Sequence, residues 1–408
     1  MAKPQVGTSL VAAILALAAV DAGAVAAQTQ GAAPGSASAQ TQSAPPGSAA
    51  AQRQGAPAAG PCCGYRTVHC DAPPAQSDLG ACGQGIAGDP EAVYFAIIGD
   101  FGQGTANKCE GRVATMIDGW NARVPISSIL TVGDNNYDEG ETKTLKANIT
   151  KEYGKYVKNK TFLPTLGNHD WNTVAKAPGY PYGRPYPYLK YFSYLSQYSP
   201  ASPGKPPVEG RYYRAPVGKL VDVFALDANY QEPDGTCCNS KQADWLKREL
   251  AASQAPWKLV LFHQPPYSSA TEDAPGVWMR WPYKDWCASV VLAGHEHVYE
   301  RLDVDGFPYY VNGLGGNKYV YTIECPPDPG SKVRYNTAHG AILGVANSKE
   351  MELCFYSIAT AQPVDKLRLK ASDRVCTPSP NTCVPAPDSK QYCALQPPLK
   401  PPDLPDCN

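Results

Sequence analysis

The sequence predicts an α/β layered domain between about residues 90 and 370. Short apolar runs typical of buried strands alternate along this stretch with segments whose apolar residues fall at helical spacing. Polar residues also recur at the points where the strand runs end. Ligands bind to open α/β sheets at the carboxyl ends of the strands, where side chains from several strands converge, so we expect these polar residues to lie together.

The expected elements follow one another in a regular order. A first helix carries its apolar residues on one face, and a second helix follows a cap at Asn239 and Ser240. The apolar face of the first helix consists of Val113, Met116, Ile117 and Trp120. The expected strands are Val93–Ile98, Ile126–Val132, Phe162–Leu166, Val221–Leu226, Trp257–Phe262 and Val290–Ala293.

The composition narrows the class of protein. The 408 residues include 36 basic and 37 acidic side chains, so the chain has no basic field to hold a nucleic acid. The length allows one large domain or two ordinary ones, with room for a sizeable core. The 14 cysteines are an even number and more than a cytosolic enzyme of this size usually carries, which favours disulfides in an oxidising compartment.

The first 27 residues resemble a secretory signal peptide. Lys3 supplies a positive start, Leu10–Val20 is apolar, and Ala24–Ala26 ends the run with small residues, so cleavage is expected near Ala26 or Ala27. An uncleaved membrane anchor is the alternative, and it is disfavoured because no basic stop follows the apolar run. We therefore expect a secreted, cell-surface or vacuolar protein whose mature form has no membrane segment.

The predicted catalytic domain, residues 90–370, is flanked by segments of unusual composition. Residues 28–60 are rich in Ala, Gln, Ser, Gly and Pro with an imperfect period of 12, which predicts a disordered linker. Residues 61–89 are Cys-rich, and residues 371–408 form a Pro/Cys-rich tail. Zinc binding is the alternative role for these cysteines, but no paired CxxC spacing occurs, so disulfides are favoured, with the pairing left open.

Two N-glycosylation sequons occur in the predicted catalytic domain. They are Asn148-Ile149-Thr150 and Asn159-Lys160-Thr161. In a secreted protein of a eukaryote both would be candidate glycan acceptors, and the sequence alone does not show whether they are glycosylated.

The polar residues at the strand ends combine oxygen and imidazole ligands. Each has an ordinary explanation, since a Gly-Asp pair often marks a turn and a single buried histidine is more often part of the core than a ligand. However, four of the six histidines belong to this set, whereas His69 and His339 lie outside it and are interpreted as structural. Carboxylate, amide and phenol oxygens together with imidazoles suit a pair of hard-to-borderline metal ions. The set is Asp100, Asp134, Tyr137, Asn168, His169, His263, His295 and His297.

Five short blocks that contain these residues resemble, in order, the signature blocks of the calcineurin-like metallophosphoesterases. Tyr137 makes the set similar to the purple acid phosphatase branch, and Gln242–Leu250 is similar to the small, tartrate-resistant type. The resemblance covers roughly residues 90–320 and implies a four-layer α/β/β/α sandwich of mixed sheets. The blocks are Gly99-Asp100-Phe101-Gly102, Gly133-Asp134-Asn135-Asn136-Tyr137, Gly167-Asn168-His169-Asp170, Val260-Leu261-Phe262-His263 and Gly294-His295-Glu296-His297.

The resemblance also implies a ligand set for two metals. One metal, ferric iron in this branch, would be bound by Asp100, Tyr137 and His297. The second metal, a divalent zinc, iron or manganese ion, would be bound by Asn168, His263 and His295. Asp134 would bridge the two metals. The sequence departs from the family pattern at Asp170, where many relatives have Glu, and at Gln264 after His263, and both departures bear on substrate preference rather than on ligation.

The implied activity is that of a secreted acid phosphatase acting on small phosphate monoesters. A hydroxide bound to the dinuclear centre would attack phosphorus, and the site would keep a charge of roughly +1 to attract the ester. His169 is the candidate donor of a proton to the leaving group, with Asp170 holding its tautomer, although His169 could instead only support a ligand. The alternatives are a phosphodiesterase or nucleotide pyrophosphatase with two divalent metals and, less favoured, a non-catalytic secreted phosphate-binding protein.

Overall fold

The structure of the chain is a computed structural model, and its described residues are 65–68, 70–104, 108–171, 185–200, 209–270, 275–324, 326–373 and 376. The chain divides into two compact units, Met1–Pro57 and Ala58–Asn408, and all described residues belong to the second. The predicted signal peptide, the predicted linker and most of the predicted tail therefore lie outside the described residues.

The first half of the fold is a six-stranded mixed sheet with the order β15-β14-β13-β2-β3-β4. Strands β2, β3 and β4 are parallel, and β13, β14 and β15 add to them in antiparallel fashion. The strands are β2 (Val93–Ile98), β3 (Ile126–Thr131), β4 (Phe162–Pro164), β13 (Gly340–Ala346), β14 (Glu350–Ser357) and β15 (Asp365–Lys370).

The second half is a seven-stranded mixed sheet with the order β12-β9-β10-β8-β7-β6-β5. Strands β6, β7, β8 and β10 are parallel, and the remaining pairs are antiparallel. The strands are β5 (Tyr213–Val217), β6 (Val221–Ala225), β7 (Trp257–Leu261), β8 (Val290–Ala293), β9 (Tyr299–Val304), β10 (Phe307–Asn312) and β12 (Ser331–Tyr335).

The described helices and the short sheet complete the fold. Strands β1 (Tyr65–Thr67) and β11 (Tyr319–Tyr321) form a two-stranded antiparallel sheet. The helices are α1 (Cys109–Asn121), α2 (Lys151–Lys158), α3 (Asn168–Trp171), α4 (Tyr186–Tyr191) and α5 (Lys241–Ala252), with a π-helical turn at Lys146–Thr150 and 3-10 turns at Leu79–Ala81, Ser193–Tyr198, Val277–Met279 and Ala371–Asp373. Within the described part of the chain, none of the helices combines the length and the apolar character that crossing a membrane requires.

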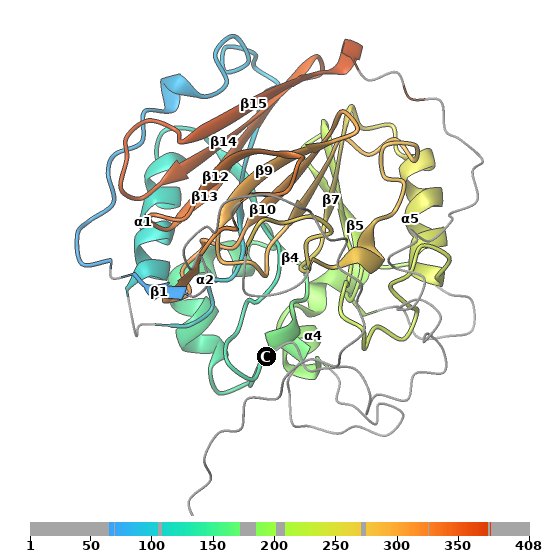
Figure 1. Cartoon of the computed structure of the whole chain (residues 1–408), viewed down its shortest axis with the longest axis horizontal. Coiled ribbons are helices and arrows are strands. Elements are labelled where there is room, and N and C mark those ends of the chain that lie inside the picture. The colour runs from blue at the N-terminus through green and yellow to red at the C-terminus, as the bar shows by residue number, and fades with distance from the viewer. Residues whose placement is uncertain are drawn as a thin grey trace, which may run out of the picture. The chain divides into compact units, whose positions relative to one another are not determined.

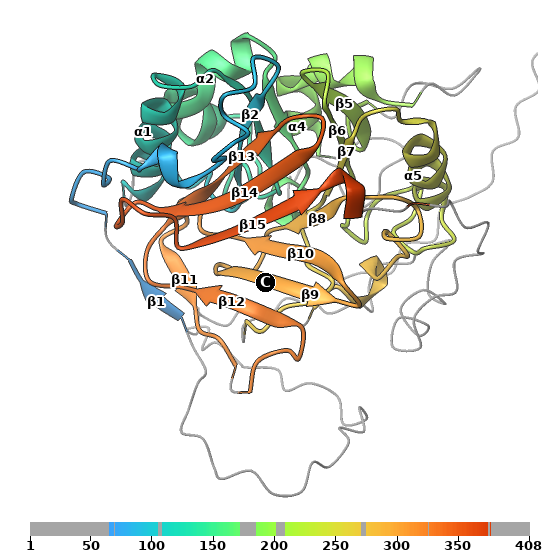
Figure 2. The same ribbon diagram turned by 90° about the horizontal axis from the view of Figure 1, so that it is seen from above.

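The two large sheets pack face to face, with helices on their outer faces. Between the sheets, the ring of Tyr299 in β9 stacks on Phe355 in β14 with centroids 4.0 Å apart. The next residue of β14, Tyr356, points to the opposite face and meets Trp120 of α1 at 5.5 Å, because successive side chains of a strand alternate. Figures 1 and 2 show α1 and α2 on one side of the strands and α5 on the other. The four layers confirm the predicted fold class.

Helix α5 covers the outer face of the seven-stranded sheet for the same reason. In β7, Leu259 and Leu261 belong to the core between the sheets, whereas Val260 and Phe262, at its carboxyl end, belong to the core under α5. The α5 cap is the predicted one, since the Ser240 hydroxyl accepts a hydrogen bond from a backbone N–H of the first turn at 3.2 Å.

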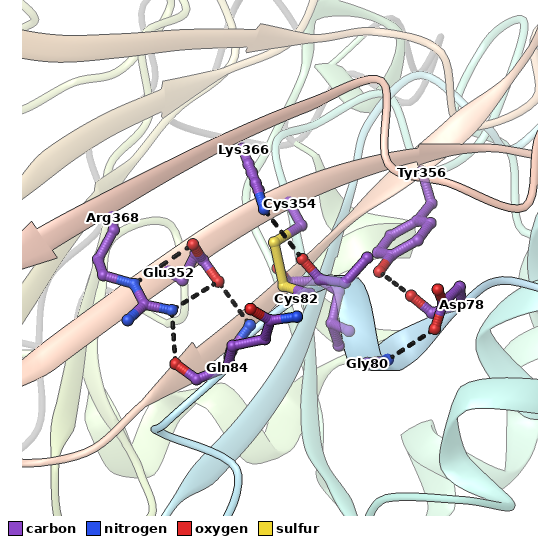
Figure 3. The surroundings of a disulfide bond; sticks show 12 residues. Asp78, Gly80, Cys82, Gln84, Glu352, Cys354, Tyr356, Lys366 and Arg368 are labelled. Atoms are coloured by element: carbon purple, nitrogen blue, oxygen red, sulfur yellow. Dashed lines mark hydrogen bonds and ion pairs between the residues drawn. A yellow bond between two sulfur atoms is a disulfide. The ribbon is translucent and has the colours of Figure 1, made fainter.

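Disulfides fasten the Cys-rich segment to the sandwich. The disulfide Cys82–Cys354 joins this segment to β14, and Glu352 in the same strand accepts the backbone N–H of Gly83 at 2.5 Å (Figure 3). A second disulfide, Cys70–Cys109, joins the segment to the start of α1. The expected disulfides are therefore present, and in the described residues they also include Cys287–Cys376 and bonded Cys237 and Cys238.

Candidate metal centre

The expected ligands follow the carboxyl ends of parallel strands in both large sheets. Asp100, Asp134 and Asn168 come shortly after β2, β3 and β4 of the six-stranded sheet. His263 and His295 come two residues after β7 and β8 of the seven-stranded sheet. Because the two sheets pack face to face, their strand ends bring both groups to one place.

Three of the ligands lie in backbone conformations that L-residues rarely adopt. The φ angles of Asp100, Asp134 and His295 are 56°, 50° and 68°, in the left-handed region. Such strain persists only where the surrounding structure enforces it, and it concentrates at functional sites. The sharp turns aim each side chain into the space between the strand ends.

The glycines of the sequence blocks make room for these side chains. A Cβ atom on Gly167 would lie 2.2 Å from Asp134 Oδ1, and one on Gly294 would lie 2.5 Å from Asp100 Oδ2. A Cβ atom on Gly133 would lie 2.4 Å from Nδ1 of His263. Any larger residue at these positions would displace a candidate ligand, which explains why glycine occupies them.

One group of donor atoms gathers around His263. Its Nε2 lies 2.9 Å from Asn168 Oδ1 and 3.3 Å from Asp134 Oδ1. The Nδ1 atom of His295 lies 3.2 Å from the same Nε2. These four residues form the set that the family pattern assigns to the second metal together with the bridging aspartate.

The other group of donor atoms gathers around Tyr137. Its phenol oxygen lies 3.3 Å from Asp100 Oδ1 and 3.2 Å from Nε2 of His297. The same Nε2 lies 3.6 Å from Asp100 Oδ1. The structure therefore brings together all seven residues that the sequence predicts as ligands.

Two of the imidazoles are held in the orientation that metal ligation needs. Nδ1 of His263 lies 2.8 Å from the Val132 carbonyl oxygen, and Nδ1 of His297 lies 2.9 Å from the Tyr319 carbonyl oxygen. A carbonyl can only accept a hydrogen bond, so each Nδ1 donates, and each Nε2 faces the site as a potential ligand atom.

The buried charged groups of the site shift one another's pKa values strongly. Burial raises the pKa of Asp134, but the imidazoles of His263 and His169 outweigh it, and the pKa falls far below its ordinary value. Burial lowers the pKa of His263, but the charges of Asp134 and Asp100 bring that pKa to about 10. Burial and repulsion from His263 lower the pKa of His295 to about 3. The carboxylates of Asp134 and Asp100 thus favour positive charge at the position of the His263 imidazole, as expected of a site that binds cations.

The donor set fits a dinuclear metal centre of oxygen and imidazole ligands. Ligand atoms of Asp100, Asp134 and His263 all lie within 4.8 Å of one another. The other such clusters found among the described residues each contain two disulfide-bonded cysteines, which cannot serve as thiolate ligands. A metal at the Asp134 cluster would compete with protons for the imidazole of His263. The affinity for the metal should therefore decrease as the pH decreases.

His169 lies at the edge of this cluster. Its side chain is 28% exposed, and its ring packs on that of Tyr137 with centroids 4.3 Å apart. Its backbone N–H donates to Asp134 Oδ1 at 3.0 Å, while its Nε2 lies 3.9 Å from Asp134 Oδ2. The imidazole can therefore meet a molecule that enters from solvent.

The expected role of Asp170 needs a correction. Its carboxylate accepts hydrogen bonds from the backbone N–H of Gly167 at 2.9 Å and from Asn135, so it braces two of the ligand turns. The tautomer of His169 is set instead by the main-chain carbonyl of Asp138, which lies 2.6 Å from Nδ1. Burial and the charge of Asp134 raise the pKa of Asp170 to about 6.

Sequence reasoning missed the groups that hold the imidazoles. The carbonyls of Val132, Asp138 and Tyr319 fix three rings, and the ring of Tyr321 stacks on His297 at 4.3 Å. Every residue has a carbonyl, so no side-chain pattern could reveal these three. The Tyr321 ring could have been found only by placing β11 beside His297, and nothing in the sequence pairs them.

Comparisons with known proteins agree with this geometry. The chain is 27% identical over 240 residues to the Fe(3+)-Zn(2+) purple acid phosphatase 12 of Arabidopsis thaliana, covering 55% of this chain and 47% of that protein. It is 40% identical over 83 residues to a purple acid phosphatase of Glycine max, covering 18% of each. The chain thus spans less than half the length of these curated relatives.

Among solved structures, the chain is similar to the purple acid phosphatase PPD1 of yellow lupin, with a TM-score of 0.54 and 16% sequence identity. The match covers 73% of this chain and 58% of the lupin chain. This match shows a shared fold. The curated relatives confirm the resemblance to the purple acid phosphatase branch. The family model of the calcineurin-like phosphoesterases matches residues 93–299, just over half of the chain, and the chain therefore belongs to the calcineurin-like phosphoesterase family.

Proposed function

We propose that this protein hydrolyses phosphate monoesters in acid solution with a dinuclear metal centre. The observation that carries the proposal is the meeting of two donor groups, around His263 and around Tyr137, with Asp134 among them. The family membership and the purple acid phosphatase relatives support the same reaction.

The donors around Tyr137 favour ferric iron, and those around His263 favour a divalent zinc, iron or manganese ion. A phenolate is a hard ligand, and it stabilises the ferric state over the ferrous state. When bound, the metal pair would supply a water nucleophile at acid pH and positive charge facing the phosphate.

The charge of the donor set suits an anionic substrate. Two aspartates and one tyrosinate bring −3 to a pair of ions that together bring +5, so the site stays positive although the whole chain has a net charge of −1. A small phosphate ester would therefore be attracted locally, without a basic field over the surface.

His169 is the candidate proton donor for the leaving group. The Asp138 carbonyl occupies its Nδ1, which leaves Nε2 of the imidazolium form to donate a proton to a departing alkoxide. Its partial exposure allows that contact, and its backbone N–H steadies Asp134.

We also propose that the protein is secreted or delivered to the cell surface or a vacuole. The support is the leader-like composition of residues 1–27 together with the disulfides of the described residues, which need an oxidising compartment. The N-terminal sequence of protein collected from the medium tests this, and a mature chain that starts near residue 28 is expected.

The proposed activity is tested with matched substrates. Purified protein should hydrolyse p-nitrophenyl phosphate fastest in acid and bis(p-nitrophenyl) phosphate far more slowly. A preference for the diester would favour the phosphodiesterase alternative. Metal-loaded protein that turns over neither ester would leave only the non-catalytic phosphate-binding alternative.

A further inference from the structure

Asn148 is a sequon asparagine that the structure buries. It lies in the π-helical turn Lys146–Thr150 just before α2, and its relative exposure is 5%. Turns of this type are rare and occur frequently at functional sites. Here the turn directs an amide toward the Tyr137 loop.

The amide of Asn148 donates two hydrogen bonds to that loop. Its Nδ2 lies 2.8 Å from the carbonyl oxygen of Tyr137 and 2.9 Å from Oδ1 of Asn136. The hydroxyl of Thr144 donates to the same Oδ1 at 2.7 Å. The backbone N–H of Tyr137 donates to the Gly102 carbonyl at 2.8 Å, so the Tyr137 residue is held from both sides.

The same side chain also packs against the loop that follows Asp100. A Cβ atom on Gly104 would lie 2.8 Å from Asn148 Oδ1, and Gly104 has a φ of 70°. Asn148 therefore sits between the loops that carry Asp100 and Tyr137, whose side chains meet at 3.3 Å.

We propose that Asn148 is a positioning residue for the Tyr137 ligand and, for that reason, not a glycan acceptor in the folded protein. The positioning role rests on the proposed function, because it assumes that Tyr137 binds a metal. Both hydrogens of the Asn148 amide are in use, and a glycan bond would consume one and require space in a buried site.

The second sequon has the opposite surroundings. Asn159 is exposed at the carboxyl end of α2, where its backbone continues the helix. Its amide nitrogen can bond to the first sugar of a lipid-linked oligosaccharide, losing a proton as the lipid pyrophosphate leaves. Of the two sequons, Asn159 is the one open to modification.

The positioning role is tested with Asn148→Asp, which keeps the shape but removes both donors, and with the exposed control Asn159→Asp. The full-length Asn148→Asp variant should lose metal to a chelator about tenfold faster or more than the control, the usual scale for groups that orient a ligand. Its visible absorption band should weaken or shift. Metal loss and a spectrum equal to those of the control would overturn the proposal.

A second pair of variants tests the same network if Asn148→Asp does not fold. Thr144→Ala removes the other donor to Asn136 Oδ1, whereas Thr144→Ser keeps it. Faster metal loss in Thr144→Ala that Thr144→Ser restores supports the network, and equal rates in both contradict it.

Hydrogen exchange in the metal-free protein separates this inference from the proposed function. Amides 136–145 should exchange faster in Asn148→Asp than in Asn159→Asp even if the wild type binds no iron and cleaves no ester. Equal exchange would overturn the proposal that Asn148 holds the Tyr137 loop, whereas faster exchange in a protein whose wild type binds no iron would keep that structural role and remove only the assignment of Tyr137 as a metal ligand.

The modification is tested by mass after expression in a glycosylating eukaryotic host. Thr150→Ala destroys the first sequon without changing Asn148, and Thr161→Ala destroys the second. The glycan mass should disappear with Thr161→Ala and persist with Thr150→Ala. The reverse result would contradict the burial argument.

Discussion

The phenol oxygen of Tyr137 lies 3.3 Å from the carboxylate of Asp100, although the two residues come from turns after different strands. This contact places a phenol oxygen beside a carboxylate at the edge of the cluster where His297 also enters. The proposed ferric site depends on this contact.

Tyr137→Phe should abolish the visible absorption band and shift the activity optimum to higher pH. The variant keeps the ring that packs on His169 but loses the oxygen, so a bound ferric ion would have no tyrosinate. The matched control is Tyr153→Phe, since Tyr153 is buried and its hydroxyl has no hydrogen-bond partner. An unchanged spectrum in Tyr137→Phe would refute the ligand assignment.

His169→Ala should lower turnover by roughly 10²-fold, with the metal content retained. Loss of a proton donor affects poor leaving groups most, so the decrease should be larger for an alkyl phosphate than for p-nitrophenyl phosphate. Equal decreases for both substrates, or a parallel loss of metal, would make His169 a support for Asp134 instead.

Gly167→Ala should remove metal binding. The added Cβ atom would lie 2.2 Å from Asp134 Oδ1, so the bridging carboxylate must move. Gly119→Ala is the control, because Gly119 is exposed in α1 with nothing within 4 Å of an added Cβ, and the change should stabilise the helix by about 0.5–1 kcal/mol. Metal titration of both variants gives the comparison, and normal binding by Gly167→Ala would mean that Asp134 is not a ligand.

The buried His339 should make the protein less stable as pH falls. Burial and the charge of His297 lower the pKa of His339 to about 3, below the ordinary 6.5, and neither ring nitrogen has a hydrogen-bond partner. Between these values the unfolded chain binds a proton that the folded chain does not, so stability is full above pH 6.5 and is lost on acidification. The loss attributable to His339 should reach roughly 3 kcal/mol near pH 4.5.

The measurement is the free energy of unfolding against pH for the wild type and for His339→Leu. The variant should show a smaller decrease between pH 6.5 and 4.5, because leucine does not titrate. Parallel curves for the two proteins would show that His339 is not buried as a neutral imidazole.

The disulfide Cys70–Cys109 should stabilise both the fold and the His297 side of the site. The Tyr319 carbonyl that holds His297 lies in β11, which pairs with β1, and β1 precedes Cys70 by a few residues. Replacing both cysteines by Ala should cost about 2–4 kcal/mol of stability and speed metal loss.

The control for that prediction is removal of the disulfide Cys82–Cys354, which joins a different part of the Cys-rich segment to β14. Removal of Cys82–Cys354 should lower the free energy of unfolding. Under conditions in which both variants are folded, it should not speed the loss of metal. Equal effects of both pairs on metal loss would show that β1 has no particular role at the site.

The central strands and the ligand set could be predicted from sequence because both leave a side-chain pattern. Strand β2 was predicted with its observed bounds, and β3 and β7 each end one residue before the predicted end. These strands are buried on both faces, so they appear as continuous apolar runs.

The antiparallel edges of the sheets left no such pattern. Strand β12 has no buried residue and β15 carries charges along much of its length, so neither resembles an apolar run. One edge of such a strand has no neighbouring strand, and its charged side chains disfavour pairing with another chain.

The position of Asp170 shows a further limit. Its place after His169 in the sequence predicted a contact between the side chains, but the α3 turn directs the carboxylate back to the Gly167 backbone. The partner of His169 is a main-chain carbonyl, which no residue type encodes.

The most direct test of the dinuclear centre is elemental analysis of the purified full-length protein together with its visible spectrum. The proposed function predicts two metal ions per chain, one of them iron, and a broad band that bleaches on strong reduction. Active protein that is colourless and free of iron would contradict the tyrosinate–iron assignment, and active protein with no bound metal would contradict the centre itself.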